Sequence, residues 1–132
     1  MTNTPPKAIK VHRRSKTLTL EFDDGDFELS FEYLRVYSPS AEVRGHSADQ
    51  QVLQVGKKFV DINHIDRVGH YAIKIQFDDG HETGIYSWDY LRELGQNQDD
   101  YWQDYLTRLK NARASRDPDT QVVQLFNPKA PK

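Results

Sequence analysis

The chain has 132 residues, 36% of them hydrophobic and 29% charged, a composition that fits one domain with a modest core. Its net charge of −2 argues against a general nucleic-acid binder, because such proteins carry a strong basic excess. The absence of cysteine excludes disulfides, thiol catalysis and every cysteine-based zinc or iron–sulfur site built by this chain alone. The first seven residues hold no apolar run, so we expect no signal peptide or membrane anchor and a cytoplasmic location.

One local pattern occurs twice along the chain. It consists of Phe-Asp-Asp-Gly and, after a short run, Tyr-Leu-Arg; the copies start at Phe22 and Phe77, with their tyrosines at Tyr33 and Tyr90. Asp-Gly between alternating apolar runs predicts a hairpin with a type I′ turn, in which glycine accepts a positive φ. Ser30 and Ser87 occupy helix N-cap positions. We therefore expect two strand–turn–strand–helix units that form two halves of one sheet.

In chain order, residues 1–7 are expected to be a disordered lead-in. Strands are predicted at 8–12, 17–22, 27–31, 59–62, 65–68 and 71–77, with a bend at Asn63-His64, a return strand from His81 to Tyr86, and a helical turn at 31–36. The helix from Trp88 should end at Gly95 as its C′ residue. An amphipathic helix is predicted at 98–114 with Asn97 as its N-cap, followed by a flexible tail, 115–132. This indicates a single α+β domain over 8–114, mostly antiparallel sheet, closed by a C-terminal amphipathic helix.

The polar residues give little support for catalysis. None of the five histidines lies at the helical spacing of a metal-binding pair, and the chain has no glycine-rich phosphate loop and no nucleophile elbow. The acidic pairs Asp23/Asp24 and Asp78/Asp79 are accounted for by their turns, and the basic cluster 13–16 is more typical of a solvated hairpin tip than of a phosphate site. His46, at the end of a polar loop, and His81, directly after the second Asp-Asp-Gly, are the two histidines placed where function could concentrate.

Three ordered segments carry a resemblance to a known family. The loop 34–46 (LRVYSPSAEVRGH), the strand 68–72 (VGHYA) and the run 77–91 (FDDGHETGIYSWDYL) resemble the DUF971 family, also called the gamma-butyrobetaine hydroxylase-like N-terminal domain. The resemblance covers roughly residues 6 to 96. In gamma-butyrobetaine and trimethyllysine hydroxylases such a domain precedes a separate iron/2-oxoglutarate catalytic domain, and from the length of 132 residues we expect that domain to be absent here. The domain also resembles a C-terminal piece of some P-loop ATPases that carry iron–sulfur clusters, which implies an accessory role in cofactor assembly.

The resemblance also implies a metal site that this chain has lost. The hydroxylases' small domain binds a structural zinc through three cysteines and a histidine, and these positions fall on Ser38, Ser40, Val43 and His81. Serine is a poor zinc ligand and valine is none, so we expect no zinc site of that design and no cofactor. In its place, we expect His81 to face Ser38, Ser40 or Glu42 through hydrogen bonds.

Three functions remain open at this stage. The first is a non-catalytic accessory domain that contacts a protein partner, linked to iron–sulfur or metalloenzyme maturation, with no nucleic-acid or membrane partner. The second is a metal-handling protein that uses His81 with His46 and Glu42, and the third is an enzyme or small-molecule-binding domain. The residues expected to form the binding surface are Arg35, Ser38, Ser40, Glu42, Arg44, His46, His81, Glu82 and Tyr86.

Overall fold

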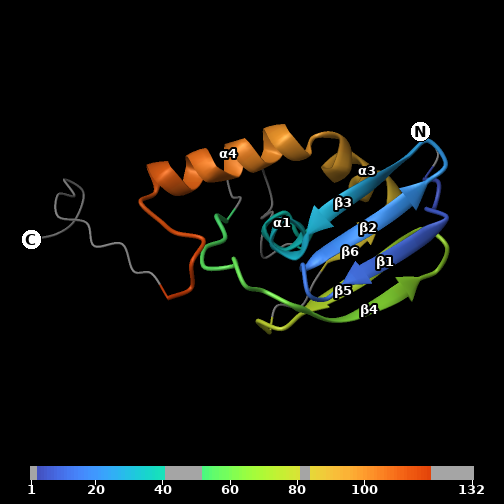
Figure 1. Ribbon diagram of the computed structural model, residues 1–132, viewed down its shortest axis with the longest axis horizontal. Coiled ribbons are helices and arrows are strands. Elements are labelled where there is room, and N and C mark those ends of the chain that lie inside the picture. The colour runs from blue at the N-terminus through green and yellow to red at the C-terminus, as the bar shows by residue number, and fades with distance from the viewer. Residues whose placement is uncertain (1–2, 41–51, 81–83, 120–132) are drawn as a thin grey trace, which may run out of the picture.

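The computed structural model describes residues 3–40, 52–80 and 84–119 and confirms a single α+β domain. Its elements are β1 (Ala8–His12), β2 (Thr17–Phe22), β3 (Gly25–Ser30), α1 (Phe31–Val36), β4 (Ile62–Val68), β5 (Ala72–Phe77), β6 (Ile85–Ser87), α3 (Trp88–Gln96) and α4 (Gln98–Asn111). The strands form two three-stranded antiparallel sheets, in the orders β1-β2-β3 and β4-β5-β6 (Figure 1). The expectation of one continuous sheet was therefore wrong, since each repeat builds a sheet of its own. No helix in the described part of the chain is both long and apolar enough to cross a bilayer.

The two hairpins differ from the prediction at their turns. Phe22 pairs with Gly25, so Asp23 and Asp24 are the central residues of the first turn. Neither has a positive φ, which a type I′ turn requires of both, and Gly25 instead adopts φ +151° as the first residue of β3. In the second hairpin the described ladder runs only from Ala72–Ser87 to Lys74–Ile85. Part of the return strand expected from His81 lies outside the described residues.

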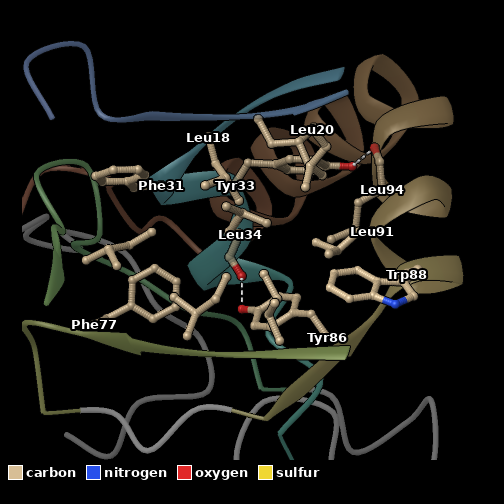
Figure 2. Close-up of a cluster of buried hydrophobic side chains, with 14 of the residues drawn as sticks. Leu18, Leu20, Phe31, Tyr33, Leu34, Phe77, Tyr86, Trp88, Leu91 and Leu94 are labelled. Atoms are coloured by element: carbon tan, nitrogen blue, oxygen red, sulfur yellow. Dashed lines mark hydrogen bonds between the residues drawn. The ribbon is translucent and has the colours of Figure 1, made fainter. Parts of the chain in front are cut away.

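Alternation along the strands places apolar side chains in a core shared by both sheets and the helices. In β2 the burial pattern alternates without a break, and in β5 the same face is buried at Ile73, Ile75 and Phe77. All six residues of α1 are buried, so this short helix lies inside the domain rather than on its surface. Figure 2 shows the centre of the core, which includes Leu18, Leu20, Phe31, Tyr33, Leu34, Phe77, Tyr86, Trp88, Leu91 and Leu94.

Both repeated helices begin as predicted. The Ser30 hydroxyl accepts a hydrogen bond from the Tyr33 amide at 3.0 Å, and the Ser87 hydroxyl accepts one from the Tyr90 amide at 3.1 Å. Each serine has an extended backbone and supplies an acceptor for an amide that has no partner within its helix. The sequence pattern therefore identified both N-caps correctly, because a cap depends on residues only three positions apart.

The two repeats hold each other through exchanged tyrosines. The Tyr33 hydroxyl donates to the Leu94 carbonyl at 2.7 Å, and the Tyr90 hydroxyl donates to the Tyr37 carbonyl at 2.6 Å. Tyr37 follows Tyr33 by four residues, as Leu94 follows Tyr90, so the two contacts are equivalent under the repeat. Each tyrosine satisfies a carbonyl near the end of the other repeat's helix.

The arginines of the repeats are exchanged in the same way. Arg35 Nε donates to the Asp79 carboxylate at 2.8 Å, and Arg92 Nη1 donates to both oxygens of Asp24 at 2.8 Å. Each Tyr-Leu-Arg segment thus binds the Asp-Asp-Gly turn of the other copy. The side chains of Arg35 and Asp79 are 6% and 20% exposed, whereas that of Asp24, which receives Arg92, is 69% exposed, so the first pair is much better shielded from solvent.

The helix that starts at Trp88 does not stop at Gly95. It continues to Gln96, with Asn97 as its C-cap, so Gly95 is inside the helix and its assignment as C′ was wrong. A Cβ at Gly95 would lie 2.6 Å from Cδ1 and 2.9 Å from Cδ2 of Phe27. Glycine is needed here because the Phe27 ring of β3 packs directly on the helix backbone.

The last helix begins as predicted, but its expected cap is missing. Asn97 makes no side-chain cap bond to α4. Its side-chain amide instead donates to the Glu93 carbonyl at 2.9 Å, at the end of α3. The helix ends at Asn111 rather than near Ala114, and Arg113 adopts a left-handed φ of +55°. Tyr105 and Leu109 are its buried residues, in agreement with the predicted apolar face.

The described parts of both terminal segments contact the domain. Asn3 donates to the Tyr71 carbonyl at 2.7 Å and accepts from the Asp89 amide at 2.8 Å, although the lead-in was expected to be disordered. After α4, the Gly56 amide donates to the Ser115 carbonyl at 2.9 Å, and the Arg116 guanidinium binds both oxygens of the buried Glu32. Residues 120–132 of the expected tail lie outside the described residues.

The segment before β4 also differs from the prediction. Residues 59–61 form no strand; the Val60 amide donates to the Lys57 carbonyl at 3.1 Å, which closes a turn. The strand β4 starts at Ile62 and runs through Asn63-His64, where the expected bend appears as a register shift between Ile62 and His64. This turn places Lys57–Phe59 at the surface, beside the end of the β1–β2 hairpin.

Candidate functional site

The sequence-predicted surface can be located only in part. Arg35, Ser38, Ser40 and Tyr86 are described, and they gather where α1 ends and β6 passes beneath it. We call these four residues, with the chain segments that join them, the α1-end site. The other predicted members, Glu42, Arg44, His46, His81 and Glu82, lie outside the described residues, as does the proposed hydrogen bond of His81.

Arg35 contributes a buried charge to this site. It lies in the last turn of α1, where a cation suits the helix dipole, and its Nε binds Asp79. Lys57 Nζ binds the same Asp79 oxygen at 2.6 Å, so one carboxylate serves two cations. Arg35 Nη1 is buried and has no hydrogen-bond partner within the described residues. A single carboxylate therefore holds both cations next to the site.

Ser38 and Tyr86 form a buried hydrogen-bonded pair. The Tyr86 hydroxyl donates to the Leu34 carbonyl at 2.6 Å, as Figure 2 shows, and it is also bonded to the Ser38 side chain. Ser38 is fully buried, and its hydroxyl also accepts from the Ser40 amide at 3.3 Å. Burial raises the pKa of Tyr86 well above the ordinary value of a phenol. A neutral phenol bonded in this way fixes the end of α1 and offers no acid or base near neutral pH.

The chain after α1 lies directly against the chain before β6. A Cβ at Gly84 would lie 2.5 Å from the Ser40 amide nitrogen and 2.8 Å from the Pro39 carbonyl carbon. This backbone-on-backbone contact requires glycine at position 84. It joins the start of the loop that follows Ser40 to the segment that leaves the second Asp-Asp-Gly turn. The two segments are therefore in contact at Pro39-Ser40 and Gly84.

Sequence reasoning missed a cavity of about 240 Å³ beside this site. Four tyrosines line this cavity: Tyr37, Tyr90, Tyr101 and Tyr105. Charged side chains of Glu93, Asp104 and Arg108 line the rest of it, with residues 36, 38 and 52–54. The tyrosine hydroxyls bond to groups of the domain: Tyr37 donates to the Tyr101 carbonyl, Tyr90 to the Tyr37 carbonyl, Tyr101 to the Glu93 carboxylate and Tyr105 to the Gln54 carbonyl. The helical spacing of Tyr101 and Tyr105 was recognised in the sequence, but only as a packing face.

Asp79 and Lys57 were also missed as members of this region. The Asp-Asp-Gly pair was explained by its turn alone, and Lys57 lies in a segment with no motif. The repeat itself contained the missing signal, because Tyr-Leu-Arg follows Asp-Asp-Gly in both copies. An acidic turn and an arginine that recur together in both copies are expected if the arginine of each copy binds the turn of the other.

The residues present do not fit the zinc site implied by the family resemblance. Ser38, at one expected ligand position, is fully buried and bonded to Tyr86. Its hydroxyl is thus already used within the protein, and it lacks the thiolate that such a site requires. Within the described ranges, no three His, Asp or Glu side chains come together as a metal-binding group.

Comparisons with known proteins were consistent with one another. The family model for "Gamma-butyrobetaine hydroxylase-like, N-terminal" matches residues 9–92. Two protein structures solved by NMR in solution are each similar to this chain over 94% of its length. The first has 48% sequence identity and a TM-score of 0.79, and the match covers 98% of that protein. The other has 49% identity and a TM-score of 0.74 over 94% of its length.

A crystal structure is similar over a shorter part of the chain. It shows a protein of unknown function from Acidithiobacillus ferrooxidans that belongs to the DUF971 family. Its sequence is 37% identical to this chain, and the two structures superpose with a TM-score of 0.58. The match covers 70% of this chain and 94% of that protein. No curated protein matches the sequence.

Proposed function

Because this chain belongs to the gamma-butyrobetaine hydroxylase-like N-terminal domain family, also named DUF971, we propose that it is a non-catalytic accessory domain that binds a protein partner. The proposed contact surface is the loop that follows Ser40, with the largely buried α1-end site as its base. Its narrower role, in iron–sulfur or metalloenzyme maturation, rests on the family resemblance alone.

The observation that carries this proposal is the contact between Gly84 and Pro39-Ser40. It holds the start of the polar loop and the exit of the second turn at one point of the surface. Loops anchored on a rigid base are the usual place for recognition in small domains. The base is rigid here because Tyr86, Ser38 and the end of α1 are hydrogen-bonded within the core.

A binding role suits the described side chains better than a catalytic one. Ser38 and Tyr86 are both committed to internal hydrogen bonds, and Arg35 is paired with Asp79. A nucleophile needs an adjacent base, and a general acid or base needs a pKa near neutrality. Neither arrangement occurs among the described members of the α1-end site.

The proposal is tested by affinity capture from native extract of the source cells. The bait is the full chain as wild type, Arg44→Ala or His46→Ala, with Arg67→Ala and His64→Ala as matched controls on the exposed β4. We expect one protein to be captured by the wild type and both controls and lost with either loop variant. Binding of that protein should then be reproduced with purified components in calorimetry.

Two results would contradict the proposal. Capture of the partner by all five baits would place its contact elsewhere on the domain. Turnover of a small molecule by the purified wild-type chain, lost in the loop variants, would replace the accessory role with an enzymatic one.

A further inference from the structure

The basic turn 13–16, which the sequence alone identified only as a solvated hairpin tip, lies against a second basic segment. Lys16 Nζ donates to the Phe59 carbonyl at 2.8 Å, and Arg13 Nη1 donates to the Ile62 carbonyl. The two cations also share one acid, with Asp61 3.4 Å from Arg13 and 3.7 Å from Lys16. These contacts attach the β1–β2 turn to the chain that leads into β4, two segments that Figure 1 shows close together.

The resulting surface is positive although the chain as a whole is negative. We define the basic patch as Arg13, Arg14, Lys16, Lys57 and Lys58 around Phe59, together with the nearby acids Asp61, Asp78 and Asp79. Five basic and three acidic side chains leave a charge of +2 on the patch, against −2 for the whole chain.

Two cations of the patch have no acidic partner in the part of the chain that the structure describes. Asp61 and Asp79 each bind two basic groups, so both carboxylates are already shared. Arg14 and Lys58 form no ion pair with any described residue, and both are exposed to solvent. Their charges are available to a partner at a low desolvation cost.

Phe59 gives the patch an apolar centre. It is 54% exposed, and the Lys58 ammonium lies 5.4 Å from its ring centroid. Val55, in the same segment, is also exposed. An apolar side chain of a partner could cover this ring, since aromatic residues and arginine are enriched where proteins bind one another.

We propose that the basic patch docks an acidic segment of a protein, whose carboxylates face Arg14 and Lys58 while an apolar side chain covers Phe59. This proposal rests on the proposed function in taking the partner to be a protein, and it adds the partner's chemistry and a second contact face. The patch adjoins the α1-end site through Asp79, which binds both Lys57 and Arg35.

A nucleic acid fits the patch less well than an acidic protein segment. A phosphate backbone presents closely spaced charges and favours an uninterrupted basic track with several stacking rings. Here the aspartates Asp61, Asp78 and Asp79 break up the positive surface, and Phe59 is the single aromatic ring of the patch. An acidic peptide can place separate carboxylates on either side of one apolar side chain.

The test is a titration of the ¹⁵N-labelled full chain, followed by NMR, with a short synthetic peptide of aspartate and glutamate that contains two leucines. The variants are Arg14→Glu/Lys58→Glu and Phe59→Ala, and Lys74→Glu/Lys110→Glu is the control with the same change of net charge. We expect amide shifts concentrated at 13–16 and 57–61, and affinity about tenfold weaker in the patch variants than in the control. Added salt should weaken the wild-type complex.

Four results of the titration would overturn the proposal. These are the absence of shifts at the patch, equal weakening in the patch and control variants, full binding by Phe59→Ala, and equal or tighter binding of a single-stranded oligonucleotide of matched charge. Unchanged amide spectra outside the patch will show that each variant is folded. The capture experiment separates this proposal from the proposed function. If Arg44→Ala loses the captured partner while Arg14→Glu/Lys58→Glu retains it, the basic patch is not a contact face and the proposed function still holds.

Discussion

Replacing Gly95 with alanine should destabilise the protein, although glycine-to-alanine changes inside helices usually stabilise. Removal of glycine from a helix interior contributes about 1 kcal/mol of stability through propensity. At Gly95 the new Cβ would fall within 3.0 Å of three ring atoms of Phe27, two of them at 2.6 and 2.9 Å. Overpacking of this kind costs roughly 1–3 kcal/mol. We therefore expect a net loss of about 1 kcal/mol, which corresponds to a fall in Tm of roughly 3–6 °C at this chain length.

A double-mutant cycle separates the two effects. Without the ring, in a Phe27→Ala background, Gly95→Ala should stabilise the protein by about 1 kcal/mol, because only the propensity gain is left. The free energy of unfolding is measured by urea denaturation for the wild type, both single variants and the double variant, with far-UV circular dichroism as the probe. The coupling energy should be about 1–3 kcal/mol. A stabilising Gly95→Ala in the wild-type background, or a coupling energy near zero, would refute the packing argument.

Three further outcomes are expected. Asp79→Asn should lower the free energy of unfolding, measured by urea denaturation, by about 3 kcal/mol, because it leaves the buried Arg35 side chain without its carboxylate. Asp24→Asn, the equivalent change at an exposed position, should lower it by less than about 1 kcal/mol. Similar losses in the two variants would contradict this argument from burial. The hydrogen bond to Glu93, followed by burial, raises the pKa of Tyr101 from 10.0 to about 12. The contact therefore stabilises the fold below pH 10, and its contribution disappears as pH rises through 12. The stability difference between wild type and Tyr101→Phe should shrink over that window, and a constant difference would argue against the assignment. Calorimetry with added Zn²⁺ should show no tight stoichiometric binding, and a one-to-one complex would show that other ligands replace the cysteines.

Features set by neighbouring residues could be read from the sequence. The caps at Ser30 and Ser87 depend on an amide three residues away, and the strand alternation depends on a two-residue period. The repeat predicted the two hairpin-plus-helix units for the same reason. Its arrangement as two sheets could not be predicted, because local alternation does not specify which strands are neighbours across repeats.

Features set by distant residues were assigned wrongly or missed. Gly95 resembles a C′ residue locally, but glycine is required there because Phe27 of the first repeat packs against the helix backbone. Arg35 was expected on a binding surface, yet its side chain is buried against Asp79, 44 residues away. The candidate site could therefore be placed at the end of α1, but the division of its residues between support and recognition required the three-dimensional structure.

The exchanged tyrosines and arginines have a consequence for how the domain assembles. Neither repeat alone can satisfy its own carbonyls and charges, since Tyr33 needs Leu94 and Tyr90 needs Tyr37. A fragment that contains one repeat would expose these groups and much of its apolar surface. Folding is thus expected to be all-or-none, with amides of both halves exchanging hydrogen through the same global opening. A gene encoding only one half would yield a chain that becomes structured only when it meets the other.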